Sequence, residues 1–137
     1  MENHYDLNDL DFEQQFAGAV LEPKLFNHEA HLRLAWIHIT NYGIDKAIEN
    51  MRGQLQNFVA TMGAKDKYND TVTVASLRAV YHFMQKSMAT NFPDFISENP
   101  RLKYQFKELL RLHYRTNIFV SEQAKKAFLE PELLPFD

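Results

Sequence analysis

Apolar side chains recur every three or four residues along most of the chain, which is the period of an α-helix. This pattern predicts helices over residues 10–20, 27–42, 44–62, 71–89 and 101–114. The clearest case is 44–62, where seven apolar residues share one face: Ile44, Ile48, Met51, Leu55, Phe58, Val59 and Met62. No stretch alternates apolar and polar residues long enough to predict a strand. We therefore expect an all-α fold, a single compact bundle of about five main helices.

Residues that favour helix ends support these boundaries. Asn27 is a suitable N-cap for the second helix, and Gly43 after it can adopt positive φ. Because Gly43 leaves only a tight connection, the second and third helices should form an antiparallel hairpin. Asp70 is predicted to cap the fourth helix, and Asn99-Pro100 gives the fifth an N-cap followed by proline.

Length and composition predict one domain covering residues 1–137, large enough to bury its own core at 45% hydrophobic residues. Residues 1–8 are polar and acidic and are expected to be mobile, His4 included. Ser121 begins a last short helix that ends near Phe128. Two prolines then favour an extended tail over residues 129–137.

The helix over 27–42 should be central, because its polar stripe is narrow and most of its circumference must be covered. That stripe consists of Glu29, Arg33 and Thr40. The same helix carries His28, His31 and His38, half of the six histidines in the chain. His28 and His31 are three residues apart, so their side chains are neighbours that could share a metal ion or a ligand. His38 lies about 10 Å further along, too far to share one ion with them.

A third metal ligand would have to come from another helix, and His113 is the best candidate. It lies on an apolar face with Leu102, Phe106 and Leu109, so we expect it to be buried. The chain has no cysteine, and three histidine nitrogens favour zinc, nickel or iron. The H-x-x-H spacing is not the H-E-x-x-H pattern of zinc proteases. The alternative is that each histidine is a core residue hydrogen-bonded to backbone or water.

The polar loop over 67–73 leads into a helix N-terminus, whose free N–H groups attract anions. One hypothesis places Tyr68, Asn69 and Thr73 in the wall of a pocket beside His28 and His31. The alternative is a capping arrangement in which Tyr68 is a hydrophobic anchor.

Basic residues elsewhere are expected to be solvated. His82 shares a helix face with Arg78 and Lys86, where a solvated position is favoured over a catalytic one. A second basic stripe could bind an acidic partner, although a solvated helix face explains it as well and is preferred. That stripe consists of Lys103, Lys107 and Arg111, with Arg115 nearby.

Three stretches of the chain together resemble a family of small, uncharacterised bacterial helical proteins. They are Phe26-x-His28-x-x-His31, Lys67-Tyr68-Asn69-Asp70-Thr71-x-Thr73, and Ser121-x-x-Ala124-Lys125-x-x-Phe128-x-Glu130-Pro131-Glu132-Leu133-x-Pro135. The resemblance covers residues 26–135 and implies a shared site around His28, His31, Tyr68 and Thr73, without naming a reaction. The family's middle motif has Tyr-His-Glu-Thr, so Asn69 replaces a histidine here. Asn69 would be a poor metal ligand but could still form hydrogen bonds in a pocket.

Charge and motif content exclude several functions. A net charge of −3 argues against a dedicated nucleic-acid binder. The apolar runs are too short to span a bilayer, and the acidic start is unlike a signal peptide, so we predict a cytoplasmic protein with no membrane partner. Without cysteines, disulfides and thiolate sites are excluded. No nucleophile elbow, Walker loop or dinucleotide fingerprint is present.

The leading functional hypothesis is a pocket that binds a small polar or anionic ligand. Its predicted lining is His28, His31, Tyr68, Asn69, Thr73 and His113. If the protein is an enzyme, His28 or His31 would be the general base. The second hypothesis is a divalent metal held by His28, His31 and His113. The third is a non-catalytic interaction protein that pairs with a second copy of itself through an apolar helix face.

Overall fold

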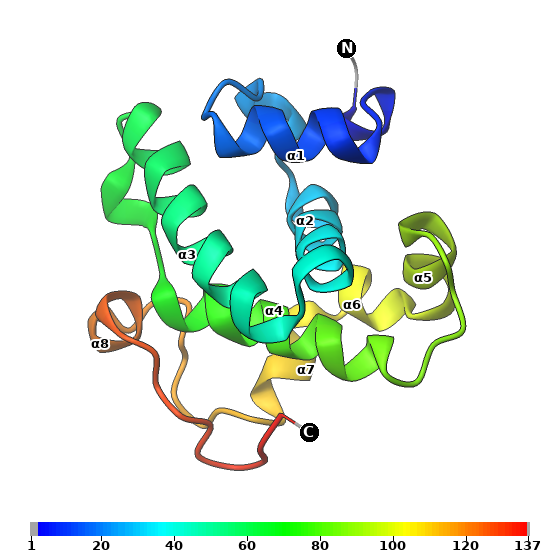
Figure 1. Cartoon of the computed structure of the whole chain (residues 1–137). Coiled ribbons are helices and arrows are strands. Elements are labelled where there is room, and N and C mark those ends of the chain that lie inside the picture. The colour runs from blue at the N-terminus through cyan, green and yellow to red at the C-terminus, as the bar shows by residue number, and fades with distance from the viewer. Residues whose placement is uncertain (1–2, 137) are drawn as a thin grey trace. The chain divides into compact units, whose positions relative to one another are not determined.

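Cap residues and a glycine delimit the two longest helices of the N-terminal half. The computed structural model describes residues 3–136 of the chain. Helix α2 (His28–Tyr42) begins after Asn27, whose Oδ1 accepts a hydrogen bond from the Ala30 N–H at 2.8 Å. It ends at Gly43, where φ is 83°, a value that glycine adopts without strain. Helix α3 (Ile44–Thr61) follows at once and packs against α2, as Figure 1 shows, so both predicted helices and their tight connection are confirmed.

Shorter elements complete this half of the chain. Helix α1 (Asp9–Ala17) contacts both α2 and α3, and ends before Gly18, three residues short of the predicted end at residue 20. Three 3-10 helices lie between or before the α-helices: η1 (His4–Asp6), η2 (Pro23–Leu25) and η3 (Lys65–Lys67). The rings of Phe16, Phe26 and Phe58 meet in pairs with centroids 4.9 to 5.2 Å apart. This aromatic cluster draws together α1, α3 and the segment before α2.

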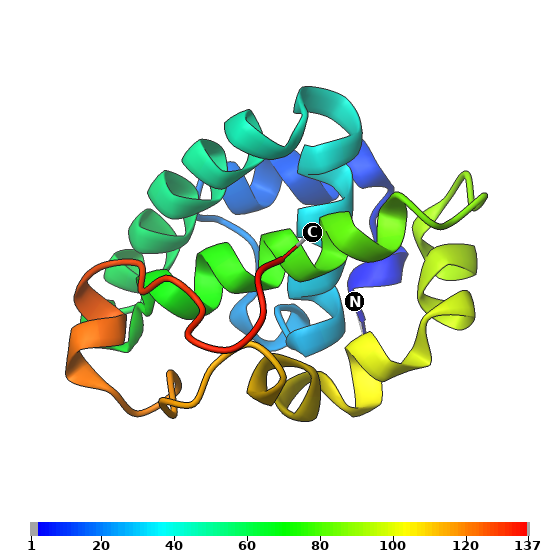
Figure 2. The same cartoon turned by 90° about the horizontal axis from the view of Figure 1, so that it is seen from below.

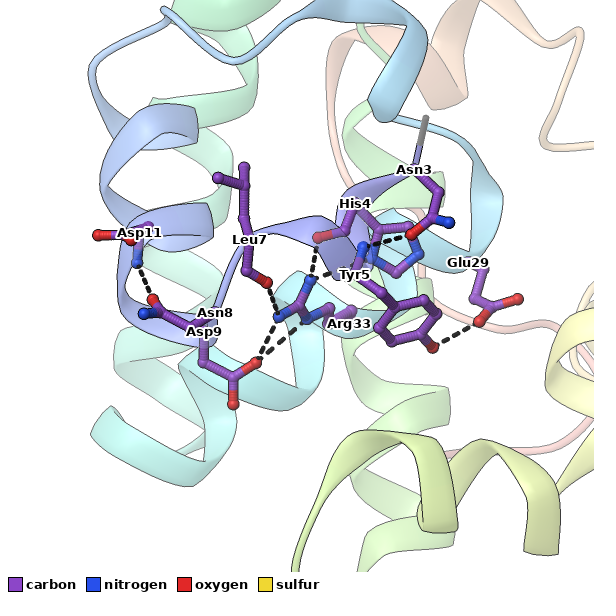
Figure 3. Close-up of polar contacts among 9 residues, drawn as sticks. All are labelled: Asn3, His4, Tyr5, Leu7, Asn8, Asp9, Asp11, Glu29 and Arg33. Atoms are coloured by element: carbon purple, nitrogen blue, oxygen red, sulfur yellow. Dashed lines mark hydrogen bonds and ion pairs between the residues drawn. The ribbon is translucent and has the colours of Figure 1, made fainter. Parts of the chain in front are cut away.

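Arg33 is buried, with 4% of its surface exposed, whereas the helical pattern placed it on a solvent-facing stripe. Residues 4–9 cover it, as Figure 3 shows. Its guanidinium donates to the carbonyls of His4 and Leu7 at 2.7 and 2.9 Å, and to Asp9 Oδ1 at 2.8 and 3.1 Å. It also lies over the Phe12 ring at 4.6 Å. We call this arrangement the Arg33 cluster.

His4 belongs to the same cluster, although the sequence analysis assigned it to a mobile start. It is 2% exposed, and its Nδ1 accepts a hydrogen bond from Arg33 at 3.1 Å, so the proton of the neutral ring is on Nε2. Beside it, the Tyr5 hydroxyl donates to Glu29. The prediction of mobility covered residues 1–8, of which 1–2 lie outside the described part of the chain. It was wrong for His4 and Leu7 because their partner, Arg33, is 26 to 29 residues away in sequence.

The C-terminal half has one long helix and several short ones. They are α4 (Asp70–Met84), α5 (Phe92–Glu98), α6 (Pro100–Tyr104), α7 (Phe106–Arg111) and α8 (Glu122–Lys126). Figure 2 shows α8 and the C-terminal segment on one side of α4. Helix α4 stops five residues before the predicted end at residue 89, so Met88, which the predicted helix included, lies beyond it and is 91% exposed.

The fifth predicted helix is broken in two at Gln105, where φ is −132° and ψ is 34°. No proline or glycine stands at this position, so the apolar pattern predicts one continuous helix over 101–114. Leu102, Phe106 and Leu109 are buried as expected. The helix ends at Arg111, however, so His113 lies in the turn that follows and not on the helix face.

Residues 129–136, which we call the C-terminal strap, are held by the turn after α7. The Leu133 N–H donates to the His113 carbonyl at 2.9 Å, and the Tyr114 hydroxyl donates to the Leu129 carbonyl at 2.8 Å. Glu132 accepts hydrogen bonds from the backbone N–H groups of Arg115 and Thr116 at 3.1 and 2.9 Å. The strap is therefore fixed along its length without forming a helix.

The chain is all-α, as predicted, and no strand occurs within residues 3–136. Its contacts divide it into an N-terminal unit, Met1–Tyr68, and a C-terminal unit, Asn69–Asp137, each described here by itself. The single domain over 1–137 stays a prediction. Among the described residues, no helix combines the length and the apolar character needed to cross a bilayer.

Candidate functional site

His28 and His31 begin helix α2 in the N-terminal unit. His28 is exposed at the first helical position, and His31 follows one turn later against the Phe26 ring, with centroids 5.7 Å apart. The Nε2 atom of His31 is buried and has no hydrogen-bond partner among the described residues. Burial, helped by the nearby His28, lowers the pKa of His31 to about 4. His31 is therefore neutral at pH 7, and a weaker base than a histidine with an ordinary pKa.

His38 lies two turns further along α2 and is fully buried. Its Nδ1 is 3.4 Å from the Asn50 amide nitrogen, which donates to it, while Nε2 has no described partner. Burial lowers the pKa of His38 below its ordinary value, against the opposing effect of the Glu13 carboxylate. Of the three α2 histidines, His38 is buried, His31 is half-buried with a buried Nε2, and His28 is exposed. Their role as core residues hydrogen-bonded to backbone or water stays a prediction.

Asn69 and Thr73, predicted as pocket residues, form hydrogen bonds at the start of α4. Asn69, and not Asp70, is the N-cap: its Oδ1 accepts from the Val72 N–H at 3.0 Å, and its amide donates to the Ile118 carbonyl at 2.7 Å. Thr73 is 1% exposed and its hydroxyl donates back to the Asn69 carbonyl at 2.8 Å. Tyr68 is half-buried at the end of η3. A ligand-binding role for these residues stays a prediction.

His113 is only half-buried, whereas the apolar pattern predicted a core position. Its Nδ1 lies 2.8 Å from the Leu134 carbonyl oxygen, and its ring stacks on Phe136 with centroids 4.1 Å apart. A carbonyl can only accept, so Nδ1 carries the proton and Nε2 remains for another partner. The C-terminal strap therefore fixes both the tautomer and the ring plane of His113.

A cavity of about 440 Å³ in the C-terminal unit includes His113 in its lining, and we call it the histidine pocket. Its walls come from α4, α6, α7, the turn after α7 and the strap. The lining residues are Ala79, His82, Phe83, Lys86, Arg101, Leu109, Leu110, Leu112, His113, Leu134, Pro135 and Phe136. This volume falls within the range of about 300–1,000 Å³ that is usual for small-molecule sites.

Charge in the histidine pocket is one-sided. Lys86 and Arg101 are cationic, and no carboxylate is among the lining residues. Neither Lys86 nor Arg101 forms an ion pair with a residue in the range 3–136. Buried Ala79, Leu109 and Leu110 supply an apolar floor. The pocket can thus accept an anion with an apolar portion.

Sequence analysis missed His82 and Lys86 as pocket residues, because it placed them on a solvated helix face. The available signal was their spacing of four residues, which places His82 in the last turn of α4 and Lys86 just after it. It did not show that the strap, some fifty residues later, covers this face. Leu112 and Leu134 were missed for the same reason.

A metal site is not present as a formed cluster. Within residues 3–136, no group of three or more histidine, aspartate or glutamate side chains is arranged to hold an ion. His28 and His31 belong to the N-terminal unit and His113 to the C-terminal unit. The shared metal site of His28, His31 and His113 stays a prediction, as do the general-base role of His28 or His31 and pairing with a second copy.

Comparison with known proteins gave no match to any family model, any curated protein or any solved structure. The resemblance to a bacterial helical family therefore stays a prediction.

Proposed function

We propose that the protein binds a small organic acid in the histidine pocket of its C-terminal unit. The single observation that carries the proposal is a cavity of about 440 Å³ with an apolar floor, no carboxylate in its lining, and two cations that form no ion pair with a described residue. This deepens the sequence hypothesis of a histidine-containing pocket for a small anionic ligand, with His113 as the shared residue.

The cations would hold the acid group. Lys86 follows the last turn of α4, and Arg101 lies near the start of α6, so two separate elements supply charge. A charge-assisted hydrogen bond from a guanidinium or ammonium to a carboxylate is roughly twice as strong as a neutral one. His113 can add a bond through Nε2, because Nδ1 is engaged with Leu134.

The apolar lining would hold the rest of the ligand. Leu112 and Leu134 are 50% and 53% exposed, so a hydrocarbon chain or ring against them would remove apolar surface from water. Phe136, stacked on His113, adds an aromatic face to the same wall. An acid with a hydrocarbon portion therefore fits better than a small inorganic anion.

The test is calorimetric titration with straight-chain carboxylates from butanoate to decanoate, each compared with the alcohol of the same length. We expect affinity to rise about fourfold per added methylene until the chain fills the pocket. The alcohols should bind at least about tenfold more weakly.

Variants localise the binding. Arg101→Met and Lys86→Met should each weaken carboxylate binding about tenfold. Lys65→Met, the same change on exposed η3 of the N-terminal unit, should have no effect. Equal binding of acids and alcohols, or equal loss in all three variants, would disprove the proposal.

A further inference from the structure

A second cavity, of about 270 Å³, lies on the C-terminal unit between α7 and the turn that follows it. We call it the basic pocket. Its lining residues are Lys107, Leu110, Arg111, Tyr114, Arg115, Thr116, Asn117, Ile118, Phe119 and Val120. Of these it shares only Leu110 with the histidine pocket. Three lining residues are cationic and none is acidic.

The three cations are spaced four residues apart along the chain. Lys107 and Arg111 lie one above the other on α7, because residues four apart share a helix face. Arg115 follows after the helix has ended, so the turn carries it to another part of the wall. Lys107 Nζ lies 5.3 Å from the centre of the Phe119 ring, across the pocket lining.

The floor of the basic pocket consists of buried, largely apolar side chains. Leu110, Tyr114 and Ile118 are at most 3% exposed. Burial, followed by the charge of Glu130, raises the pKa of the Tyr114 phenol far above its usual range, and the hydroxyl donates to Leu129. Tyr114 is thus a neutral structural residue that forms part of the cavity lining.

Two acidic residues lie close by: Glu130, whose charge acts on Tyr114, and Glu132. Glu132 accepts hydrogen bonds from the N–H groups of Arg115 and Thr116 and from the Thr116 hydroxyl. These bonds, with the charge of Arg115, lower the pKa of Glu132, so it is ionised at neutral pH. The two carboxylates offset part of the positive charge, and the three cations of the lining still outnumber them.

We propose that the basic pocket binds the phosphate group of a small phosphorylated molecule through Lys107, Arg111 and Arg115. Guanidinium groups match phosphate oxygens in pairs, and two of the three cations are arginines. The exposed Val120 and half-buried Phe119 offer an apolar surface to the organic part. The site is separate from the histidine pocket and does not depend on the function proposed for it.

The experiment titrates the full-length protein, in phosphate-free buffer of low ionic strength, with inorganic phosphate and with phenyl phosphate, followed by calorimetry. We expect saturable binding of phenyl phosphate. Arg111→Met and Lys107→Met should each weaken it at least about tenfold. Lys126→Met, an exposed cation of α8 outside the pocket, should change it less than about twofold.

The two ligands distinguish the sources of the phosphate. Tighter binding of phenyl phosphate than of inorganic phosphate supports an organic phosphate as the ligand. Equal binding of the two would show a site for the free anion and would contradict the proposal that the ligand is an organic phosphate. No saturable binding, or equal weakening by Lys126→Met, would overturn the site. Arg101→Met, which changes the histidine pocket, should leave phosphate binding unchanged. A negative result for carboxylate binding in the histidine pocket is therefore distinguishable from a negative result for phosphate binding in the basic pocket. Unchanged circular dichroism spectra confirm that the variants are folded.

Discussion

Arg33 and Arg101 show how differently the two units use the same side chain. In the N-terminal unit, Arg33 is buried and its guanidinium is satisfied by residues 4–9. In the C-terminal unit, Arg101 is exposed, lines a cavity and forms no ion pair with a described residue. A charge with its partners inside the fold is structural, whereas a charge facing a cavity without a partner is available to a ligand.

The two units also differ in how regular they are. The N-terminal unit is built on two long helices and uses its polar residues internally. Within residues 69–136, the C-terminal unit has four helices of five to seven residues, a turn and a strap. The turn after α7 contributes to both cavities, and α4 also lines the histidine pocket. Binding residues lie on loops more often than in helix centres, which favours this unit for the proposed sites.

Removing Arg33 should have the largest effect on stability. Arg33→Met leaves the carbonyls of His4 and Leu7 without their buried donor, so we expect a loss of about 3 kcal/mol or more in the free energy of unfolding. Arg33→Lys should lose less, because it keeps the charge but not the planar fork. Urea denaturation measures both. Arg111→Met replaces an exposed arginine and should change the free energy of unfolding by less than about 0.5 kcal/mol. Equal losses in Arg33→Met and Arg111→Met would contradict the distinction between a structural and an available arginine.

Acid should destabilise the protein through its buried histidines. The unfolded state protonates His31 near pH 6.5, but the folded state does so only near pH 4. The contribution of neutral His31 to the free energy of unfolding is therefore fully present above about pH 6.5. It decreases by up to about 3 kcal/mol as the pH falls to about 4.

Urea denaturation of wild type and His31→Leu at each pH checks this effect. His38, whose pKa is also lowered, stays in both proteins, so the difference between them isolates His31. Parallel curves from pH 7 to pH 4 would contradict a depressed His31 pKa.

The cap at Asn69 should matter more than an ordinary cap. Asn69→Ala removes both the bond from the Val72 N–H and the bond to the Ile118 carbonyl, for an expected loss of about 2 kcal/mol. Asn91→Ala removes a similar cap on the exposed start of α5, for about 1 kcal/mol or less. Thermal denaturation of both variants compares them. Similar losses would show that the bond to Ile118 contributes little.

Glu132 should have the smallest effect. Its pKa is lowered by bonds from Thr116 and Arg115, so its charge stabilises the fold above the ordinary carboxylate pKa and stops doing so as the pH falls through its folded value. Glu132→Gln keeps an acceptor oxygen but removes the charge. We expect a slight decrease in melting temperature at pH 7 that disappears as the pH falls through the lowered pKa of the folded state. A difference that persists in acid would indicate a packing effect instead.

The sequence predicted local features well because local residues determine them. Asn27, Gly43 and the apolar period located α2 and α3 almost to the residue. The burial of Arg33 could not be predicted, because it depends on residues more than twenty positions away that show no apolar pattern of their own.

The candidate site was predicted only in part. His113 lines the histidine pocket, but the sequence placed it on a helix, since nothing at Gln105 indicates the break. The other lining residues gather because the strap returns to the turn after α7, a long-range contact that periodicity does not encode. Asn69 and Thr73 were predicted as ligand-binding residues from a loop motif. The hydrogen bonds observed for these two side chains join them to backbone groups of the chain itself.

The Arg33 cluster has a consequence for synthesis on the ribosome. Residues 4–9 leave the exit tunnel before Arg33, the side chain that organises them, which is translated some 24 to 29 residues later. Helix α1 therefore cannot reach its final environment until the start of α2 has emerged. During synthesis this segment must wait for a later part of the chain to complete its contacts.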